Sequence, residues 1–472
     1  MKEVFALHIV IMFCCPEVHL GAFFMDKITN TGTKGTLGLM ACVAIIVGGM
    51  IGSAIFSLSG LSMFTAGPAA IVSWLLAAII MLIYGLCVAE LSTIFPKSGG
   101  VFVFPSKALG KTEKQGSFWG WISTWGYINA NIVAIAFAAI YVSTYIGAGF
   151  GLPDGLQIPL AIISILLCFI LNILRISVTG KVNTALVVSL VTALGIFVCV
   201  AFFSGEWNSN LLTPFFAQGN SGPAGFLAAV PTAMVGYGSI VAIAFMVGEV
   251  KNPNRTVPKS VLIAMAIVAC IYIVVILATS GLVSAEFLRD NPNFMFIPLY
   301  AAVFTKLTAF PWLAKVVSIA AVLALLTTML VVIALTSRAI QASAEKKLIP
   351  SIFAKNGKTG TPIAASTLVS VLAIIVSCFP SLTQQIVSFA ALFAATTISI
   401  NFVSLLVARK KIPYVEGSFK APGGKILPIV ALALIIICYI PDIITGGWII
   451  WAYTIAWYVV GIAIFYIATK RA

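Results

Sequence analysis

Two short runs of glycine and serine interrupt otherwise apolar stretches of the chain. The first is GGMIGSAIF at residues 48–56, and the second is GYGS at residues 236–239. Because glycine destabilises a helix by about 1 kcal/mol relative to alanine, each run permits a local break. The backbone N–H groups at a break can bind an anion, and its C=O groups can bind a cation. The pattern therefore predicts a site for a carboxylate and an ammonium group.

We expect the amides of the first run to bind the carboxylate and the carbonyls of both runs to receive the amine. The expected carboxylate-binding residues are Ile51, Gly52, Ser53 and Ala54, and the expected amine-binding residues are Gly48, Gly236, Tyr237, Gly238 and Ser239. Tyr237 is expected either to cover the bound molecule or to pack in the interior. The other interpretation of both runs is that small residues let neighbouring helices approach closely.

The elements that carry these runs are expected to be membrane-spanning helices. Of the 472 residues, 61% are hydrophobic and 8% are charged, whereas an ordinary soluble domain is about 25% charged. A span needs about 20 apolar residues. Twelve segments meet this need, at residues 37–64, 69–94, 117–147, 157–175, 179–204, 224–249, 258–283, 312–342, 361–379, 384–409, 425–442 and 447–469. The sequence thus predicts an all-α, multi-pass membrane protein.

Lysine and arginine gather in alternate loops between these segments and at both flanks. The positive-inside rule places such loops in the cytoplasm, so both termini are expected there, in a protein of the cytoplasmic membrane. The net charge of +14 is then a consequence of topology. This distribution argues against a nucleic-acid partner and makes membrane lipid the expected surroundings.

Residues 1–24 form a doubtful leader. The stretch VFALHIVIMFCC is too short to span a membrane, and no small-residue cleavage site follows it. We favour Met25 as the true start of the chain. An interfacial N-terminal helix is the alternative.

Four motifs resemble those of the amino acid–polyamine–organocation superfamily of permeases. GGMIGSAIF resembles that family's G-x-I-G-x-G-I-F signature, and GEVKNPNRTVP at residues 248–258 resembles E-x-x-N-P-x-R-x-x-P. FPKSGGVFVFPSKALG at residues 95–110 is similar to P-x-x-G-G-x-Y, and GTPIAAS at residues 360–366 to the G-T-P start of the ninth helix. The resemblance covers about residues 36–469.

The resemblance implies the leucine-transporter-type fold, with twelve transmembrane helices. Two five-helix inverted repeats form its core, and helices 1 and 6 are discontinuous. In this sequence the first repeat would cover residues 25–204, the second residues 224–410, and helices 11 and 12 residues 421–472. The two glycine runs fall in the first and sixth segments, which are matching positions of the two halves.

The resemblance also implies further site residues. Tyr127, Ala130 and Asn131 occupy positions similar to the family's pocket wall. For Tyr127 the alternative is packing or gating, and for Asn131 it is a core hydrogen bond. Thr327 and Thr328 would lie opposite the first break and are a candidate sodium site. The alternative is that these hydroxyls bond back to their own helix.

The deep segments contain almost no acidic residues. Glu90 and Glu249 stand at the cytoplasmic ends of their segments, where we expect them to pair with lysine or arginine. A cationic side chain of a substrate would therefore lack a counter-charge. The family's glutamate after the sixth-helix break matches Val241 here, and its fifth-helix lysine is absent from residues 187–191. Proton coupling through those groups is thus in doubt.

These observations predict a secondary transporter that moves a neutral amino acid by alternating access. The alternatives are an amine or polyamine carrier, or an amino acid/amine exchanger of the same fold; an ion channel is the alternative from another class. No motif of an enzyme is found, and the nine cysteines form no paired motif, so we expect no cofactor and no metal. Monomer and homodimer both stay open.

Overall fold

The computed structural model describes residues 35–174, 181–216, 218–413, 416–445 and 447–471. The doubtful leader at residues 1–24 and the start at Met25 lie outside the described residues. Within the described ranges the chain is helical, and its one extended pairing is an isolated bridge between Leu37 and Val250.

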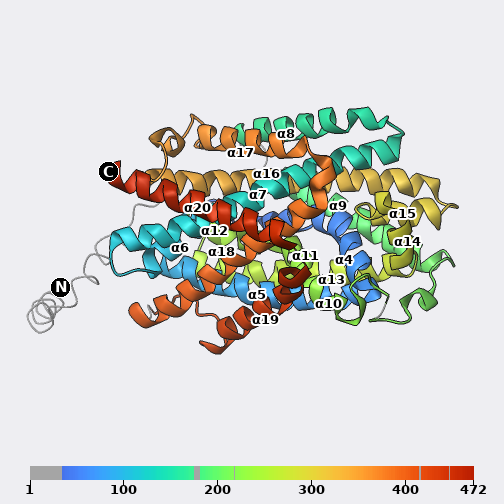
Figure 1. Ribbon diagram of the computed structural model, residues 1–472, viewed down its shortest axis with the longest axis horizontal. Coiled ribbons are helices and arrows are strands. Elements are labelled where there is room, and N and C mark those ends of the chain that lie inside the picture. Colours follow the sequence, from blue (N-terminus) through green and yellow to red (C-terminus); the bar gives the residue numbers. More distant parts are fainter. Residues whose placement is uncertain (1–34, 175–180, 217, 414–415, 446, 472) are drawn as a thin grey trace, which may run out of the picture.

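The helices form an elongated bundle (Figure 1). The first half comprises α3 (Leu39–Met50), α4 (Ser59–Ala66), α5 (Ala70–Ile94), α6 (Gly100–Ala108), α7 (Glu113–Phe150), α8 (Gln157–Ile173) and α9 (Lys181–Phe203). The second half comprises α10 (Gly225–Ala228), α11 (Val230–Gly236), α12 (Ala242–Phe245), α13 (Pro253–Ser280), α14 (Ala285–Asp290), α15 (Pro298–Thr305), α16 (Pro311–Glu345), α17 (Ile363–Ser377), α18 (Thr383–Lys411), α19 (Ile426–Thr445) and α20 (Gly447–Arg471).

Each of the twelve expected segments contains helix, but fewer are long and apolar enough to cross a membrane. Within the described residues seven helical stretches meet that test, or eight if one bent pair counts as a span. One of the seven, Leu39–Ile94, covers two expected segments. As a single helix its 56 residues would measure about 84 Å, which is more than twice the thickness of the hydrocarbon core of a membrane. Three apolar helices, at Gln157–Ile173, Ile363–Ser377 and Ile426–Pro441, are shorter. The chain is thus an integral membrane protein, whereas twelve crossings stay a prediction.

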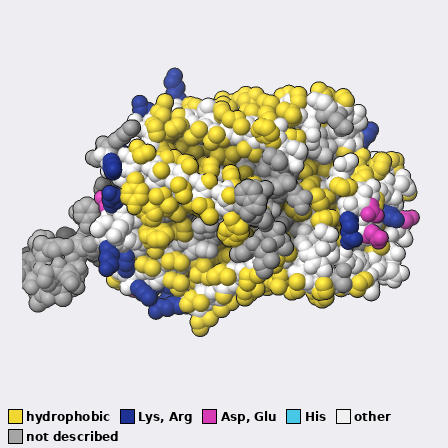
Figure 2. Space-filling view, viewed as in Figure 1, with side chains coloured by type: hydrophobic (Ala, Val, Ile, Leu, Met, Phe, Trp, Pro, Cys, Tyr) yellow, Lys and Arg dark blue, Asp and Glu magenta, His cyan; other side chains and the backbone are white. Residues whose placement is uncertain are grey.

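The outer surface matches a membrane environment. Figure 2 shows a broad hydrophobic belt, with lysine and arginine side chains gathered toward the end that carries α6. A mixed group of charged residues stands at the other end, where α14 contributes exposed Glu286, Arg289 and Asp290. An apolar belt between charged ends is the pattern expected where lipid chains surround a bundle.

The two glutamates at the ends of deep segments both pair with arginine, as the sequence predicts. Glu90 at the end of α5 binds Arg409 of α18, and both side chains are nearly inaccessible to solvent. Glu249 follows α12 and binds Arg338 of α16 at 2.7 Å. These pairs place compensated charge at one end of the bundle, close to lysine-bearing α6.

Candidate substrate site

The first break lies where the first glycine run predicts it. Helix α3 ends at Met50, and Ile51 and Gly52 form a bend. A five-residue π-helix at residues 54–58 then leads into α4. π-Helical turns are rare and frequently mark functional sites, because they disturb the regular backbone pairing. We call residues 51–53 the first break.

The second break interrupts the segment that runs from residue 222 to residue 245. Helix α11 ends at Gly236, Tyr237 forms a turn, and a 3-10 turn at residues 238–241 leads into α12. The two parts are bent by 44°. We call residues 237–241 the second break. Its position coincides with the second glycine run.

The two broken helices lie side by side and touch at their glycines. A Cβ atom added to Gly49 would lie 2.8 Å from Ser239 Cβ, and one added to Gly236 would lie 2.8 Å from Ala54 Cβ. Ser239 Oγ also donates to Gly49 O at 3.0 Å. The glycines therefore serve close packing, the second interpretation of the runs, as well as interrupting both helices.

The carbonyl groups around the breaks accept hydrogen bonds from side-chain hydroxyls. Thr327 Oγ1 donates to Gly48 O at 3.4 Å. Tyr272 donates to Met50 O and, at 3.2 Å, to Gly236 O. The sequence predicts the carbonyls of Gly48 and Gly236 as receivers of an amine, and in the structure both already have hydroxyl partners. Sequence reasoning missed Tyr272, because a tyrosine in an apolar helix carries no distinguishing signal.

Three buried aromatic residues pack beside the second break. The Trp74 ring lies 5.9 Å from the Tyr237 ring and 4.9 Å from the Tyr272 ring, centroid to centroid. The two tyrosine rings lie 5.1 Å apart. The Tyr237 hydroxyl donates to Trp74 O at 3.3 Å. Tyr237 is thus held in the packed interior.

Each break contains one residue that is not fully buried. Ser53 is half-buried and Gly238 is exposed. A Cβ atom added to Gly238 would meet no atom within 4 Å, whereas Ile51 and Gly52 are buried.

At the first break, α16 packs closely against Gly52. A Cβ atom added to Gly52 would lie 1.7 Å from Thr328 Oγ1. That hydroxyl is buried and has no hydrogen-bond partner among the described residues. Its neighbour Thr327 donates to Ala324 O at 2.8 Å, as a threonine inside a helix commonly does. Thr328 of the candidate sodium site thus adjoins the first break, and Thr327 contacts Gly48, which precedes the break in α3.

The residues expected in the pocket wall lie on α7. Ala130 is buried, and Tyr127 and Asn131 are half-buried. The Tyr127 ring contacts the Phe245 ring at a centroid distance of 5.9 Å. Phe245 is the last residue of α12, so Tyr127 reaches the second broken helix beyond its break. Asn131 lies one turn further along α7.

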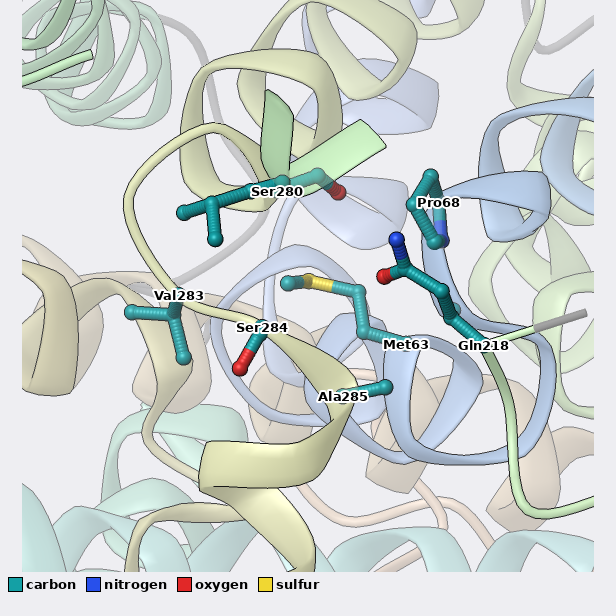
Figure 3. Close-up of a pocket in the computed structure, with 9 residues that line it drawn as sticks. Met63, Pro68, Gln218, Ser280, Val283, Ser284 and Ala285 are labelled. Carbon is teal, nitrogen blue, oxygen red and sulfur yellow. The ribbon is translucent and has the colours of Figure 1, made fainter. Parts of the chain in front are cut away.

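A small cavity is present elsewhere in the bundle, between α4, α13 and the loops beside them (Figure 3). It is a partly open hollow with about 150 Å³ of empty space, and no part of it is wide enough for a water molecule. Figure 3 shows the side chains of Met63 and Gln218 pointing toward its middle. Met63 lies ten residues after Ser53, or about 15 Å along a helix, so this cavity is separate from the breaks. The lining residues are Met63, Gly67, Pro68, Leu211, Gln218, Ser280, Val283, Ser284 and Ala285.

The region around the breaks offers dipoles and hydroxyls. Within the described residues no three histidine, cysteine, aspartate or glutamate side chains lie together in a way that could hold a metal. Backbone groups with hydroxyls can bind a polar molecule and release it unchanged. This arrangement suits recognition of a zwitterion.

Comparison with known proteins identifies transporters as relatives of this chain. The chain is 26% identical over 461 residues to the branched-chain amino acid permease BcaP of Bacillus subtilis, covering 93% of this chain and 94% of that protein. It is 25% identical over 455 residues to the methylthioribose transporter of the same organism, covering 92% and 94%. It is 26% identical over 402 residues to the chloroplastic cationic amino acid transporter 6 of Arabidopsis thaliana, covering 80% and 66%.

These relatives are transporters and not enzymes, in agreement with the absence of an enzyme motif from the sequence. The family model described as amino acid permease matches residues 37–469. This range includes both breaks and nearly all described helices. The chain therefore belongs to the amino acid permease family.

Proposed function

We propose that this permease is a secondary transporter that carries a neutral amino acid across the cytoplasmic membrane by alternating access. The observation that carries the proposal is the meeting of the two breaks. Ser239 of the second broken helix bonds to Gly49 of the first, and Ala54 of the first packs against Gly236 of the second. Interruptions in corresponding segments of the two halves are the pattern typical of a transporter site.

In this proposal the backbone binds both ends of the substrate. The amides of Gly52, Ser53 and Ala54 lie at the start of the second half-helix and would bind the carboxylate. The Ile51 amide, expected to join them, donates to Val47 O at 2.8 Å and closes the last turn of α3. The carbonyls around Gly48 and between Gly236 and Ser239 would receive the ammonium group. No bond is made or broken, and the substrate leaves as it entered.

The preference for a neutral side chain rests on charge. Among the described residues, Glu90 is the charged side chain that is buried, and Arg409 already neutralises it. A lysine, arginine or polyamine substrate would bring a second positive charge without a counter-ion. The likeness to a branched-chain amino acid permease agrees with a neutral substrate, and the likeness to a cationic amino acid transporter makes that class the alternative.

For the chain as a whole we propose twelve crossings, with both termini in the cytoplasm. In this arrangement two inverted repeats cover residues 25–204 and 224–410, and two further helices lie in residues 421–472. The gathering of lysine and arginine toward one end of the bundle supports the orientation (Figure 2). The three shorter apolar helices would cross the membrane if the bilayer becomes thinner around them or if they lie nearly perpendicular to its plane.

A sodium ion is a second candidate ligand, favoured by one observation. Thr328 Oγ1 is buried beside Gly52 without a hydrogen-bond partner among the described residues. Oxygen atoms are the ligands that hard cations prefer. Thr327 and Thr328, with carbonyls of the first break, would then form the coupling site.

The experiment uses the purified full chain in detergent and in proteoliposomes. A thermal-shift screen against the twenty L-amino acids and common amines identifies the binder, and uptake of that radiolabelled compound is then measured. We expect saturable uptake of a neutral amino acid that unlabelled compound abolishes by competition. Binding of amines alone would favour the amine carrier, and ionic current without saturable uptake would favour a channel.

A further inference from the structure

The hydroxyl group of Tyr272 lies where the two half-helices end. It donates to Met50 O, the carbonyl of the last residue of α3, and to Gly236 O, the carbonyl of the last residue of α11. A helix C-terminus carries a partial negative charge, on the order of half an elementary charge. One proton of one phenol is therefore shared between the negative ends of both broken helices.

The surrounding packing fixes this hydroxyl in place. Tyr272 is fully buried on α13, and its ring is held edge-on by Trp74 and tilted against Tyr237. A tyrosine side chain with its ring fixed has no freedom to move its hydroxyl elsewhere. The separation of Met50 O and Gly236 O is thus set by a rigid group.

The local hydrogen bonding is incomplete. A carbonyl oxygen has two lone pairs and a phenol has a single O–H, so one donor serves two acceptors here. Trp74 Nε1, in the same aromatic cluster, is buried without a partner among the described residues. The cluster therefore retains acceptor and donor capacity that a small polar ligand could use.

We propose that Tyr272 is the positioning residue of the amine subsite, an inference that rests on the proposed function. Its hydroxyl holds Met50 O and Gly236 O so that both converge on one ammonium group. The ammonium has three N–H donors, which the two carbonyls and the Tyr272 oxygen together satisfy. The proton of Tyr272 stays on Tyr272 throughout, and no proton leaves the substrate.

The test compares two tyrosines that make the same kind of bond. Tyr272→Phe removes the hydroxyl that joins the two breaks. Tyr145→Phe is the matched control, because Tyr145 also donates to a backbone carbonyl of the first broken helix, at Phe56 O, beyond the break. Binding to each purified protein is measured for the tightest binder among the twenty L-amino acids, and for the carboxylic acid that lacks its amine.

We expect Tyr272→Phe to weaken binding of the amino acid by about tenfold or more, the effect of losing a well-placed hydrogen-bonding group around a charge. Binding of the amine-free acid should be unchanged, and Tyr145→Phe should change neither affinity. Replacement of Tyr272 by 4-aminophenylalanine, which keeps N–H donors at the same place, should restore amino-acid binding. If Tyr272→Phe fails to fold, binding of the amino acid to the 4-aminophenylalanine variant is the measurement that tests the inference.

Four outcomes would overturn the inference. Unchanged amino-acid affinity in Tyr272→Phe, or equal weakening of both ligands, would leave Tyr272 a structural residue while the proposed function stands. A folded 4-aminophenylalanine variant that does not bind would have the same meaning. A wild-type protein that binds none of the twenty amino acids would instead overturn the proposed function, and this inference with it.

Discussion

Arg409 and Glu90 form an ion pair in which one guanidinium group satisfies both carboxylate oxygens. Arg409 Nε lies 2.8 Å from Glu90 Oε1, and Arg409 Nη2 lies 2.5 Å from Glu90 Oε2. The amide of Ala421 donates to the same carboxylate at 2.7 Å. The pair thus joins α5, α18 and the segment that leads to α19 into one hydrogen-bonded unit.

Glu90→Gln should destabilise the protein strongly, because it leaves the Arg409 charge buried without its counter-charge. Breaking a buried pair on one side costs on the order of 3 kcal/mol. Thermal unfolding in detergent measures the effect. Glu113→Gln is the control, since its partner Lys346 and Glu113 itself are both exposed, and we expect no measurable change there. Equal melting temperatures for both variants would contradict the assigned role of Glu90.

Gly52→Ala should lower thermal stability, because a methyl group at this position would collide with Thr328 Oγ1. Overpacking of this kind costs about 1–3 kcal/mol. Gly195→Ala on α9 is the matched control: a Cβ atom there meets nothing within 4 Å, so alanine should be neutral or stabilising. The double variant Gly52→Ala/Thr328→Ala should recover part of the loss. Gly52→Ala with unchanged stability would mean that α16 does not press on the first break.

The sequence predicts the two breaks well, because glycine acts locally. Gly49 and Gly52 weaken the helix wherever it packs, so their effect can be recognised without knowing any neighbour. The pairing of Glu90 with a basic residue was also predictable, since a carboxylate at a membrane segment end requires compensation. Counting the apolar segments placed the two runs in the first and sixth segments, and the family resemblance implied the same placement.

Other features depend on contacts between distant segments and could not be read from composition. Tyr272 meets Met50 across 222 positions in the chain, and its apolar surroundings look like those of any packing tyrosine. The packed position of Tyr237 likewise depends on Trp74. Helix bounds were also predicted only approximately: α17 is shorter than the expected segment 361–379, whereas α7 and α16 extend beyond the expected segments 117–147 and 312–342.

Loosening one end of the bundle should expose Cys42. The Leu37 amide donates to Glu249 O, and the Lys251 amide donates to Leu37 O, so the start of α3 is attached to the end of the second broken helix. The Glu249 side chain in turn binds Arg338. Cys42 is fully buried close to Leu37. Glu249→Gln should therefore speed the reaction of Cys42 with N-ethylmaleimide, followed by peptide mass spectrometry.

The control for that experiment is Glu345→Gln, which removes an exposed glutamate at the end of α16. Its Cys42 should react as slowly as in the wild type. If Glu249→Gln also leaves Cys42 protected, the Glu249–Arg338 pair does not restrain this end of the bundle, and opening there must depend on the backbone bonds of Leu37.

The variant Thr328→Val tests whether the Thr328 hydroxyl binds sodium or whether Thr328 serves helix packing alone. Valine has nearly the shape of threonine without the hydroxyl, and removing a buried unpaired hydroxyl is neutral or stabilising. If sodium binds here, sodium chloride should raise the melting temperature of the wild type above its value in choline chloride, and Thr328→Val should abolish that difference. Uptake should show the same dependence. A wild type that melts and transports equally in both salts, with Thr328→Val at least as stable, would assign the two threonines to helix packing alone.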